Sequence, residues 1–183
     1  LIEGLLEGSE VRLDTDFFDN REALTRLARK VVFTGRIDRY YDYCFGRLDY
    51  RSLRFDTRVI DTPNFQGNAV VNYTSADVPF TRIIEHKHFE MFGDEVNRIP
   101  STVVTEEYPA EWSEGMEPFY PVNDSRNQAV YERYRSLALA EPDTIFGGRL
   151  AEYRYYDMAP LIASVIDRFA CRAATGNEGK VKK

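Results

Sequence analysis

The sequence predicts a mixed α/β fold in which an antiparallel sheet is inserted into part of a Rossmann-like domain. Helix-like and strand-like stretches alternate near both ends of the chain, as they do in α/β domains. Between them, several short segments alternate apolar and polar residues, which is typical of antiparallel strands. The 183 residues, of which 43% are hydrophobic, suffice for a substantial core in one domain or in parts of two.

Residues 1–47 are expected to form the first part of the α/β region. Residues 10–18 alternate with period two and predict a strand, which a short helix capped by Asp19 should follow. Residues 30–35 (KVVFTG) predict a buried strand that ends in a tight glycine turn. The next helix is predicted from an apolar stripe formed by Ile37, Tyr40, Tyr41, Cys44 and Phe45.

Residues 48–123 are expected to form the inserted antiparallel sheet. Alternating or β-branched stretches predict strands at residues 53–59, 68–73, 80–89 and 102–108. A polar turn that contains Asp77 and Pro79 should join the second of these strands to the third. Residues 109–123 are rich in Pro and Gly and predict a loop.

Residues 124–172 are expected to return to the α/β region. The pattern predicts a helix over residues 125–140 and a strand over residues 144–146. The final helix should bury one face made of Leu161, Ile162, Val165, Ile166 and Phe169. Residues 173–183 are expected to form a flexible tail.

Charge and composition argue against several classes of protein. A net charge of −6 is unlike that of a general nucleic-acid binder, which carries a basic face. No apolar run approaches the about 18–20 residues that cross a bilayer, so no membrane segment is expected. Cys44 and Cys171 provide neither a disulfide framework nor a metal knuckle, which fits the cytoplasm. The start at Leu1, without an initiator Met, suggests the middle of a longer protein.

Arginine and tyrosine are the chemically informative residues of the composition. The chain has 19 Arg but only 5 Lys, and the planar guanidinium grips phosphate groups at two points. A general preference for Arg in the genome would give the same bias. The 12 Tyr and 12 Phe suit a cleft for sugars or ring cofactors, because their faces stack and the tyrosine hydroxyls form hydrogen bonds.

The stretch GGRLAEYRYYDM, residues 147–158, combines features of an anion site. Its two glycines let backbone N–H groups approach a bulky group, and Arg149 offers a fork to phosphate. Asp157 can cap a helix whose positive end would stabilise negative charge. An ordinary strand–turn–helix with an exposed Arg is the alternative. The G-x-G-x-x-G fingerprint of dinucleotide folds occurs nowhere in the sequence.

Two further groups of residues have competing interpretations. His86 and His88 would share one face of a strand, but no third ligand has suitable spacing, so we expect a structural role and no metal. Asn72 and Arg82 lie on neighbouring predicted strands and could reach one cleft. Tyr120 and the tyrosines at 153, 155 and 156 could add rings and hydroxyls there, although each alone is a common surface or core residue.

Four blocks of the sequence resemble bacterial UDP-galactopyranose mutases in order and spacing. They are TGRIDRYYDYCFGRLDYRSLRF, QGNAVVNYTSADVPFTRIIEHKHFE, EPFYPVN and FGGRLAEYRYYDM. The resemblance covers about residues 10–170 and only the C-terminal half of that enzyme, because the N-terminal FAD fingerprint and the mobile uridine-binding loop have no counterpart. It implies that residues 1–47 and 124–172 belong to an FAD-binding domain, and that residues 48–123 form its inserted substrate-binding sheet.

The resemblance implies an FAD-dependent isomerase that interconverts UDP-galactopyranose and UDP-galactofuranose, a precursor of cell wall polysaccharide. In this family the flavin is reduced, and its N5 atom forms a covalent adduct with the sugar while UDP leaves. The resemblance also implies UDP-galactose as the substrate and allows a homodimer. Alone, the chain is expected to be inactive, because part of the cleft would be missing.

Residue by residue, the resemblance assigns two groups of side chains. The UDP-sugar would contact Asn72, Arg82, Tyr120 and Tyr155, with Arg82 as the catalytic cation that stabilises the departing diphosphate. The residues toward FAD would be Phe17, Thr34, Gly35, Arg149, Tyr156, Asp157 and Met158. Phe80 and Phe119 stand where Tyr is common in the family.

Two other functions remain open on the sequence. One is a non-catalytic module that binds sugar nucleotides or carbohydrate through its tyrosines. The other is a different FAD-dependent oxidoreductase, such as an amine oxidase, against which the set of Asn72, Arg82 and Tyr120 argues.

Overall fold

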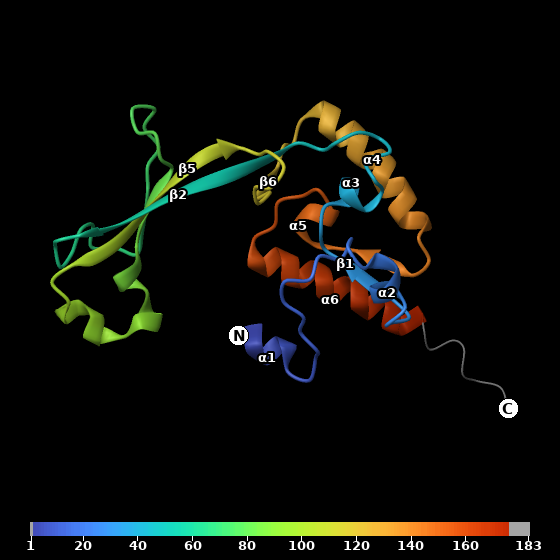
Figure 1. The fold of residues 1–183 in the computed structure, drawn as a ribbon, viewed down its shortest axis with the longest axis horizontal. Helices are drawn as coiled ribbons and strands as arrows, with labels where there is room; N and C mark the ends of the chain where they lie inside the picture. The colour runs from blue at the N-terminus through green and yellow to red at the C-terminus, as the bar shows by residue number, and fades with distance from the viewer. Residues whose placement is uncertain (1, 176–183) are drawn as a thin grey trace.

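The structure, a computed structural model, describes residues 2–175 and divides them between an α/β lobe and a sheet lobe (Figure 1). The α/β lobe contains a two-stranded parallel sheet made of β1 (Val31–Phe33) and β7 (Thr144–Phe146). Its helices are α1 (Ile2–Leu6), α2 (Arg21–Thr25), α3 (Ile37–Tyr40), α4 (Ser125–Ala140), α5 (Gly148–Ala151) and α6 (Met158–Thr175). None of these helices is long and apolar enough to cross a lipid bilayer.

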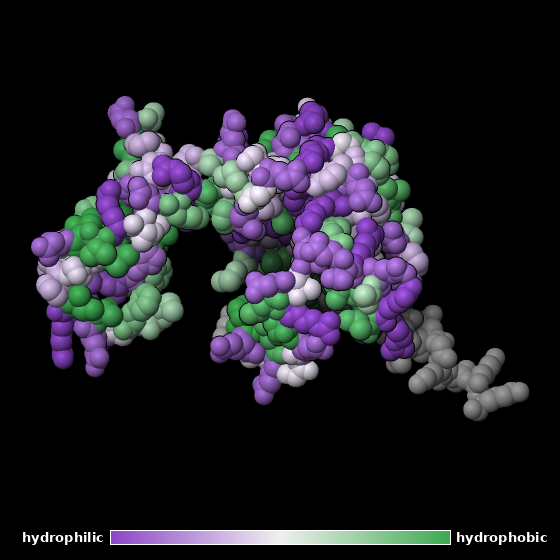
Figure 2. All heavy atoms as spheres, in the orientation of Figure 1, coloured by the Kyte–Doolittle hydropathy of each residue, from purple (hydrophilic) through white to green (hydrophobic). Residues whose placement is uncertain are grey.

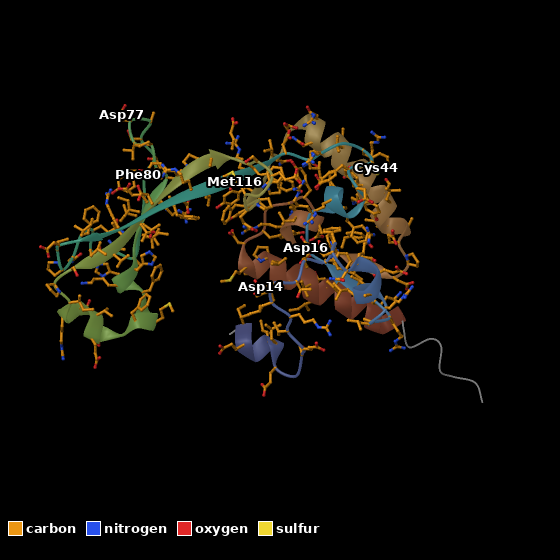
Figure 3. All side chains as sticks on the ribbon, in the orientation of Figure 1. Asp14, Asp16, Cys44, Asp77, Phe80 and Met116 are labelled. Atoms are coloured by element: carbon orange, nitrogen blue, oxygen red, sulfur yellow. The ribbon has the colours of Figure 1, made fainter. Side chains whose placement is uncertain are left out.

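The sheet lobe is a five-stranded antiparallel sheet in the order β3-β4-β5-β2-β6. Its strands are β2 (Tyr50–Ile60), β3 (Val70–Asn72), β4 (Arg82–Glu85), β5 (Thr102–Glu111) and β6 (Tyr120–Pro121). Three short 3₁₀ helices connect β4 to β5, namely η1 (His86–His88), η2 (Glu90–Phe92) and η3 (Asp94–Arg98). The long pair β2–β5 extends away from the α/β lobe, and Asp77 marks the tip of the β3–β4 connection (Figure 3).

An aromatic core holds the α/β lobe together. The Tyr40 ring lies 4.8 Å from that of Phe33 and 4.7 Å from that of Phe146, so α3 packs on both parallel strands. The Tyr40 hydroxyl is 3.0 Å from Thr144 Oγ1, which satisfies both buried hydroxyl groups. Tyr134 of α4 is fully buried and completes this core. The apolar spacing of residues 37–40 and 130–138 therefore produced helices that face the parallel strands.

Tyrosine and arginine side chains join the two lobes. The Tyr153 hydroxyl lies within hydrogen-bond distance of two carbonyls, that of Asp49 at 2.5 Å and that of Val122 at 2.9 Å, and so links the loop after α5 to both ends of the sheet region. The Arg36 guanidinium, paired with buried Asp38 at 3.0 Å, lies 4.3 Å from the centre of the Trp112 ring. These contacts fix the base of the sheet against the α/β lobe.

Most predicted elements of the central and C-terminal regions are present. The strands around 53–59, 102–108 and 144–146 are observed, as are the helix over 125–140 and the final helix. The predicted buried face of the final helix is wrong, because Ile162, Val165 and Ile166 are exposed. The segment predicted as a loop over 109–123 contains the end of β5 and all of β6. The mixed α/β class is confirmed, with an antiparallel sheet and a parallel sheet. Within residues 2–175 the parallel sheet has two strands, so a Rossmann-like arrangement remains a prediction. Of the predicted tail, Ala173–Thr175 continue α6, and residues 176–183 lie outside the described residues.

Three predictions in the N-terminal region are wrong. Residues 10–18 contain no strand, although their alternation is regular, because no neighbouring strand within the described residues pairs with them. The helix that follows is α2, whose N-cap position is Asn20 and not Asp19. The helix predicted through Phe45 stops at Tyr40, since Asp42 and Tyr43 take positive φ values of 51° and 56° that an α-helix cannot contain.

Two of the predicted central strands are too long. The strand expected over residues 68–73 is limited to Val70–Asn72, and the one expected over residues 80–89 ends at Glu85. Beyond Glu85 the chain turns into η1, because the Glu85 carboxylate and the side chains of η1 bind the backbone of the preceding loop. His86 and His88 therefore do not lie on a strand.

Candidate functional site

A polar row crosses one face of the antiparallel sheet. Asn72 pairs with Arg82, and Arg82 pairs with Glu107 on the next strand. Residues directly opposite each other in an antiparallel ladder project to the same face. The side chains of Asn72, Arg82 and Glu107 therefore share one face, which places the amide beside the guanidinium that the sequence had assigned to the same cleft.

Tyr120 lies on this same face. It pairs with Arg51, which in turn pairs with Glu111 of β5. Glu111 is four residues from Glu107 on one strand, and residues an even number apart project to the same face. The ladder thus brings Tyr120 and Arg82 to one surface although 38 positions separate them in the sequence.

A cavity of about 700 Å³ connects these positions at the base of the sheet. Its polar and aromatic lining includes Arg51, Arg82, Glu107, Trp112 and Tyr120. Figure 2 shows that the two lobes enclose a deep notch below their junction. A concave, largely preformed surface with a few polar side chains is the usual form of a site for a small ligand.

The Arg82 guanidinium is oriented by a buried carboxylate. Arg82 Nε lies 3.3 Å from Glu107 Oε1, and Glu107 is only 6% exposed. The Thr81 hydroxyl donates to the same oxygen at 3.0 Å. Arg82 Nε is itself buried and has no hydrogen bond of good geometry within residues 2–175. The cation is therefore held at the surface of the cavity in a position from which it can bind an anion.

A second cluster borders the sheet and is formed by Tyr120, Arg149 and Tyr155. The rings of Tyr120 and Tyr155 have centroids 5.7 Å apart, and the Arg149 guanidinium carbon is 5.8 Å and 4.7 Å from those centroids. The Tyr155 hydroxyl donates to Asp157 Oδ1 at 2.7 Å, which raises the pKa of Tyr155. Three of the predicted site residues, from β6, α5 and the loop before α6, thus meet at one place.

Arg149 also makes local hydrogen bonds that its sequence context did not indicate. Its Nε and Nη2 donate to the Tyr156 carbonyl at 3.1 Å and 2.8 Å, so the fork shapes the loop that precedes α6. Tyr156 is buried, whereas Asp157 and Met158 are exposed at the start of α6. The Asp157 carboxylate, expected as a helix cap, accepts the Tyr155 hydroxyl.

The ends of the two parallel strands meet beside this cluster. Thr34 and Gly35 follow β1, and Gly147 and Gly148 follow β7. A Cβ atom on Gly148 would lie 3.7 Å from Thr34 Cβ, and the Gly148 φ of +84° favours glycine, so the two turns are in close contact. The carboxyl edge of parallel strands is where α/β folds bind nucleotides.

Phe17 lies in the aromatic core of the α/β lobe, and the histidines lie in the sheet lobe. The Phe17 ring packs against Phe33 and Tyr40, so its described contacts belong to the aromatic core. His86 Nε2 is 2.7 Å from Thr105 Oγ1, and His88 Nε2 is 3.1 Å from Glu85 Oε2, so the two rings have different partners. Within the part of the chain that the structure describes, no group of three or more His, Cys, Asp or Glu side chains could hold a metal ion.

Of the lining residues named above, Arg51, Glu107 and Trp112 were missed from the sequence. The pair Glu106–Glu107 inside an otherwise strand-like segment was the available signal, because carboxylates are seldom buried without a partner. Trp112, the one Trp of the chain, was not predicted as a site residue because it lies in the segment predicted to be a loop.

An α/β chain with an arginine- and tyrosine-lined cavity at the base of its antiparallel sheet has the features of a protein that binds a small polar ligand. A family model described as "GLF: UDP-galactopyranose mutase" matches residues 1–155. The chain belongs to the UDP-galactopyranose mutase family.

Three relatives illustrate the extent of the similarity. The Klebsiella pneumoniae protein named "Probable UDP-galactopyranose mutase" is 38% identical over 151 residues, which cover 81% of this chain and 38% of that protein. An Escherichia coli dTDP-fucopyranose mutase is 32% identical over 172 residues, or 91% of this chain and 45% of the relative. A Mycoplasma pneumoniae UDP-galactopyranose mutase is 40% identical over 141 residues, which cover 75% of this chain and 34% of that protein. The chain thus spans less than half the length of these relatives.

Proposed function

We propose that this chain is the substrate-binding part of an FAD-dependent isomerase that interconverts UDP-galactopyranose and UDP-galactofuranose. The observation that carries the proposal is the convergence of Asn72, Arg82 and Tyr120 on one sheet face, at whose border Tyr120 meets Arg149 and Tyr155. Membership of the mutase family supports the same function.

Arg82 and Tyr155 are proposed to bind the diphosphate of the substrate. A guanidinium beside a buried carboxylate loses little mobility on binding, so its interaction with the developing diphosphate anion is preorganised. The Tyr120 hydroxyl would donate to a phosphate oxygen, and the Tyr155 hydroxyl would do so by exchanging Asp157 Oδ1 for the phosphate. The Asn72 amide would bind a polar group of the sugar nucleotide. Arg82 thereby stabilises the charge that develops as UDP departs.

The meeting of the β1 and β7 turns fits an extended cofactor such as FAD. The Gly147–Gly148 turn leaves room for close backbone approach, and Thr34, Gly35, Arg149 and Tyr156 surround it. When bound, a reduced flavin would supply an electron-rich nucleophile toward the sugar. The chain's own contribution is to orient the sugar nucleotide and to stabilise its leaving group.

The nucleotide dependence of binding tests this function. Isothermal titration calorimetry of the 183-residue chain should show a single UDP site, with UMP at least about tenfold weaker and uridine weaker still, because each lost phosphate removes charge-assisted hydrogen bonds. Equal affinity for UDP and uridine, or no binding of either, would contradict the proposal.

A dTDP-sugar mutase is a second candidate. The E. coli dTDP-fucopyranose mutase aligns with 91% of this chain, a larger share than the other two relatives described. The diphosphate contacts would be the same, and only the base and sugar would differ. Tighter binding of dTDP than of UDP in the same titration would favour this candidate.

A further inference from the structure

The loop of residues 61–68, which leads into β3, is bound by one buried carboxylate. Glu85 is fully buried, and its two oxygens accept separate backbone N–H groups, from Phe65 at 2.9 Å and from Gln66 at 2.8 Å. Two backbone donors of an irregular loop are thereby satisfied without a neighbouring strand. The Glu85 backbone N–H donates in turn to the Ala69 carbonyl at 2.9 Å, at the start of β3.

Lys87 and His88 extend these contacts from the same turn. Lys87 Nζ donates to the Pro63 carbonyl at 2.8 Å and to the Ile99 carbonyl at 2.9 Å, which joins the loop to the end of the η helices. His88 Nε2 lies 3.1 Å from Glu85 Oε2 and 3.3 Å from Asn64 Oδ1. The side chains of Glu85, Lys87 and His88 therefore hold one loop at several points.

Strand β3 has little else to hold it. It is three residues long, lies at the edge of the sheet and, among residues 2–175, pairs only with β4. Beyond the strand itself, the Tyr73 N–H donates to the Thr81 carbonyl at 2.9 Å. Short edge strands with exposed hydrogen bonds open at low free-energy cost, so the anchoring of the preceding loop decides how well β3 is ordered.

We propose that Glu85, Lys87 and His88 form a clamp that positions β3 and thereby holds Asn72 opposite Arg82. The proposal rests on the proposed function, since it assigns a purpose to the clamp in sugar-nucleotide binding. Glu85 is three residues from Arg82 along β4, roughly 10 Å at the rise of a β-strand. The members of the clamp are therefore positioning residues that act through β3.

Lys87 offers the cleanest test because its removal leaves no buried charge unpaired. Lys87→Met removes both carbonyl contacts, and Lys87→Arg restores a donor of similar reach. Lys30→Met is the matched control, because Lys30 Nζ also donates to a proline carbonyl, that of Pro142 at 2.6 Å, in the other lobe. Glu85→Gln is the more severe variant, since its amide has one acceptor oxygen for two N–H donors.

Two readouts are measured on the full chain for each variant. Hydrogen exchange follows the amides of Phe65, Gln66 and Tyr73, and titration gives the affinity for UDP. In Lys87→Met, exchange at these amides should rise about tenfold and UDP affinity should fall severalfold, as expected for the loss of charge-assisted hydrogen bonds. Lys87→Arg should recover both values, and Lys30→Met should change neither.

The outcomes separate the clamp from the proposed function. Faster exchange at all three amides with unchanged UDP affinity would show a local stabiliser and overturn the positioning role. Unchanged exchange in Lys87→Met and in Glu85→Gln would overturn the clamp itself. If the wild-type chain fails to bind UDP, the proposed function fails, and exchange at Tyr73 alone then decides whether the clamp orders β3.

Discussion

Arg82 shares its sheet face with the nearly buried carboxylate of Glu107. Removing the guanidinium would leave that carboxylate unpaired and facing any bound anion. We therefore expect Arg82→Ala to weaken UDP binding between about tenfold and about a hundredfold, the range for losing a charged partner at a partly exposed site.

Arg58 provides the matched control for this substitution. It pairs with another nearly buried carboxylate, Glu106, through β2–β5 neighbours that project to the opposite face of the sheet. Arg58→Ala should leave the UDP affinity within about twofold of the wild-type value while affecting stability similarly. An equal loss of affinity in both variants would indicate that general damage to the sheet, and not the site, is being measured.

Glu85 should make the stability of the sheet lobe depend on pH. Burial raises the pKa of this carboxyl, but hydrogen bonds from the Phe65 and Gln66 backbone, together with contacts from Thr102 and His88, outweigh burial, and the net pKa is lowered. A lowered pKa in the folded state stabilises the protein above the unfolded value near 4.5, and this stabilisation is lost as the pH falls through the folded value.

The comparison of wild type with Glu85→Gln in urea unfolding measures this effect. The difference in unfolding free energy should be largest at pH 6 and above, and should shrink progressively below about pH 4.5. The titrating groups that do not contact residue 85 are common to both chains, so their contributions cancel; His88, 3.1 Å from Glu85 Oε2, is the exception. A difference that does not vary between pH 3 and pH 7 would contradict the role of the ionised carboxylate.

At the scale of elements, the side chain of Asp124 caps the start of α4. Asp124 Oδ1 accepts the Asn127 backbone N–H at 2.7 Å and its Nδ2 at 3.0 Å, and Asn127 Oδ1 accepts the Asp49 N–H at 3.0 Å. The cap therefore both begins the helix and links it to the strand region. Asn127 is fully buried, so these bonds are shielded from water.

Asp124→Ala should lower the unfolding free energy by about 1 kcal/mol, the usual value of an N-cap. Asp124→Asn, which keeps an acceptor oxygen, should recover most of the loss in the same chemical denaturation experiment. An Ala variant as stable as wild type would mean that the cap contributes nothing here.

The elements that could be predicted are those whose signals are local. The alternation in β2 and β5 sufficed to predict these strands, because each is the long pairing partner of the other. The periodicity of α4 sufficed to predict that helix, which packs on the core through Tyr134. The predicted strand at residues 10–18 failed since alternation alone does not supply a partner. The length predicted for the helix after β1 was wrong because Asp42 and Tyr43 adopt left-handed conformations. Such conformations are uncommon for residues other than glycine, so the sequence does not predict them.

At the scale of the whole molecule, the site depends on pairings distant in sequence. Asn72 and Arg82 could be placed together because a short connection joins their strands. The approach of Tyr120 to Tyr155 and the burial of Glu107 beside Arg82 depend on the register of β2, β5 and β6, which no local pattern reveals. The roles of these residues came from resemblance and remain proposals.

Residues of the sheet lobe and of the loop before α6 are proposed to bind the same diphosphate. The direct test is a UDP titration of the isotopically labelled 183-residue chain followed by two-dimensional NMR. Signals of Arg82, Tyr120 and Tyr155 should shift together with one dissociation constant, while those of Arg54 and Arg58 on the opposite sheet face stay in place. Shifts confined to one lobe, or different dissociation constants for Arg82 and Tyr155, would contradict the claim.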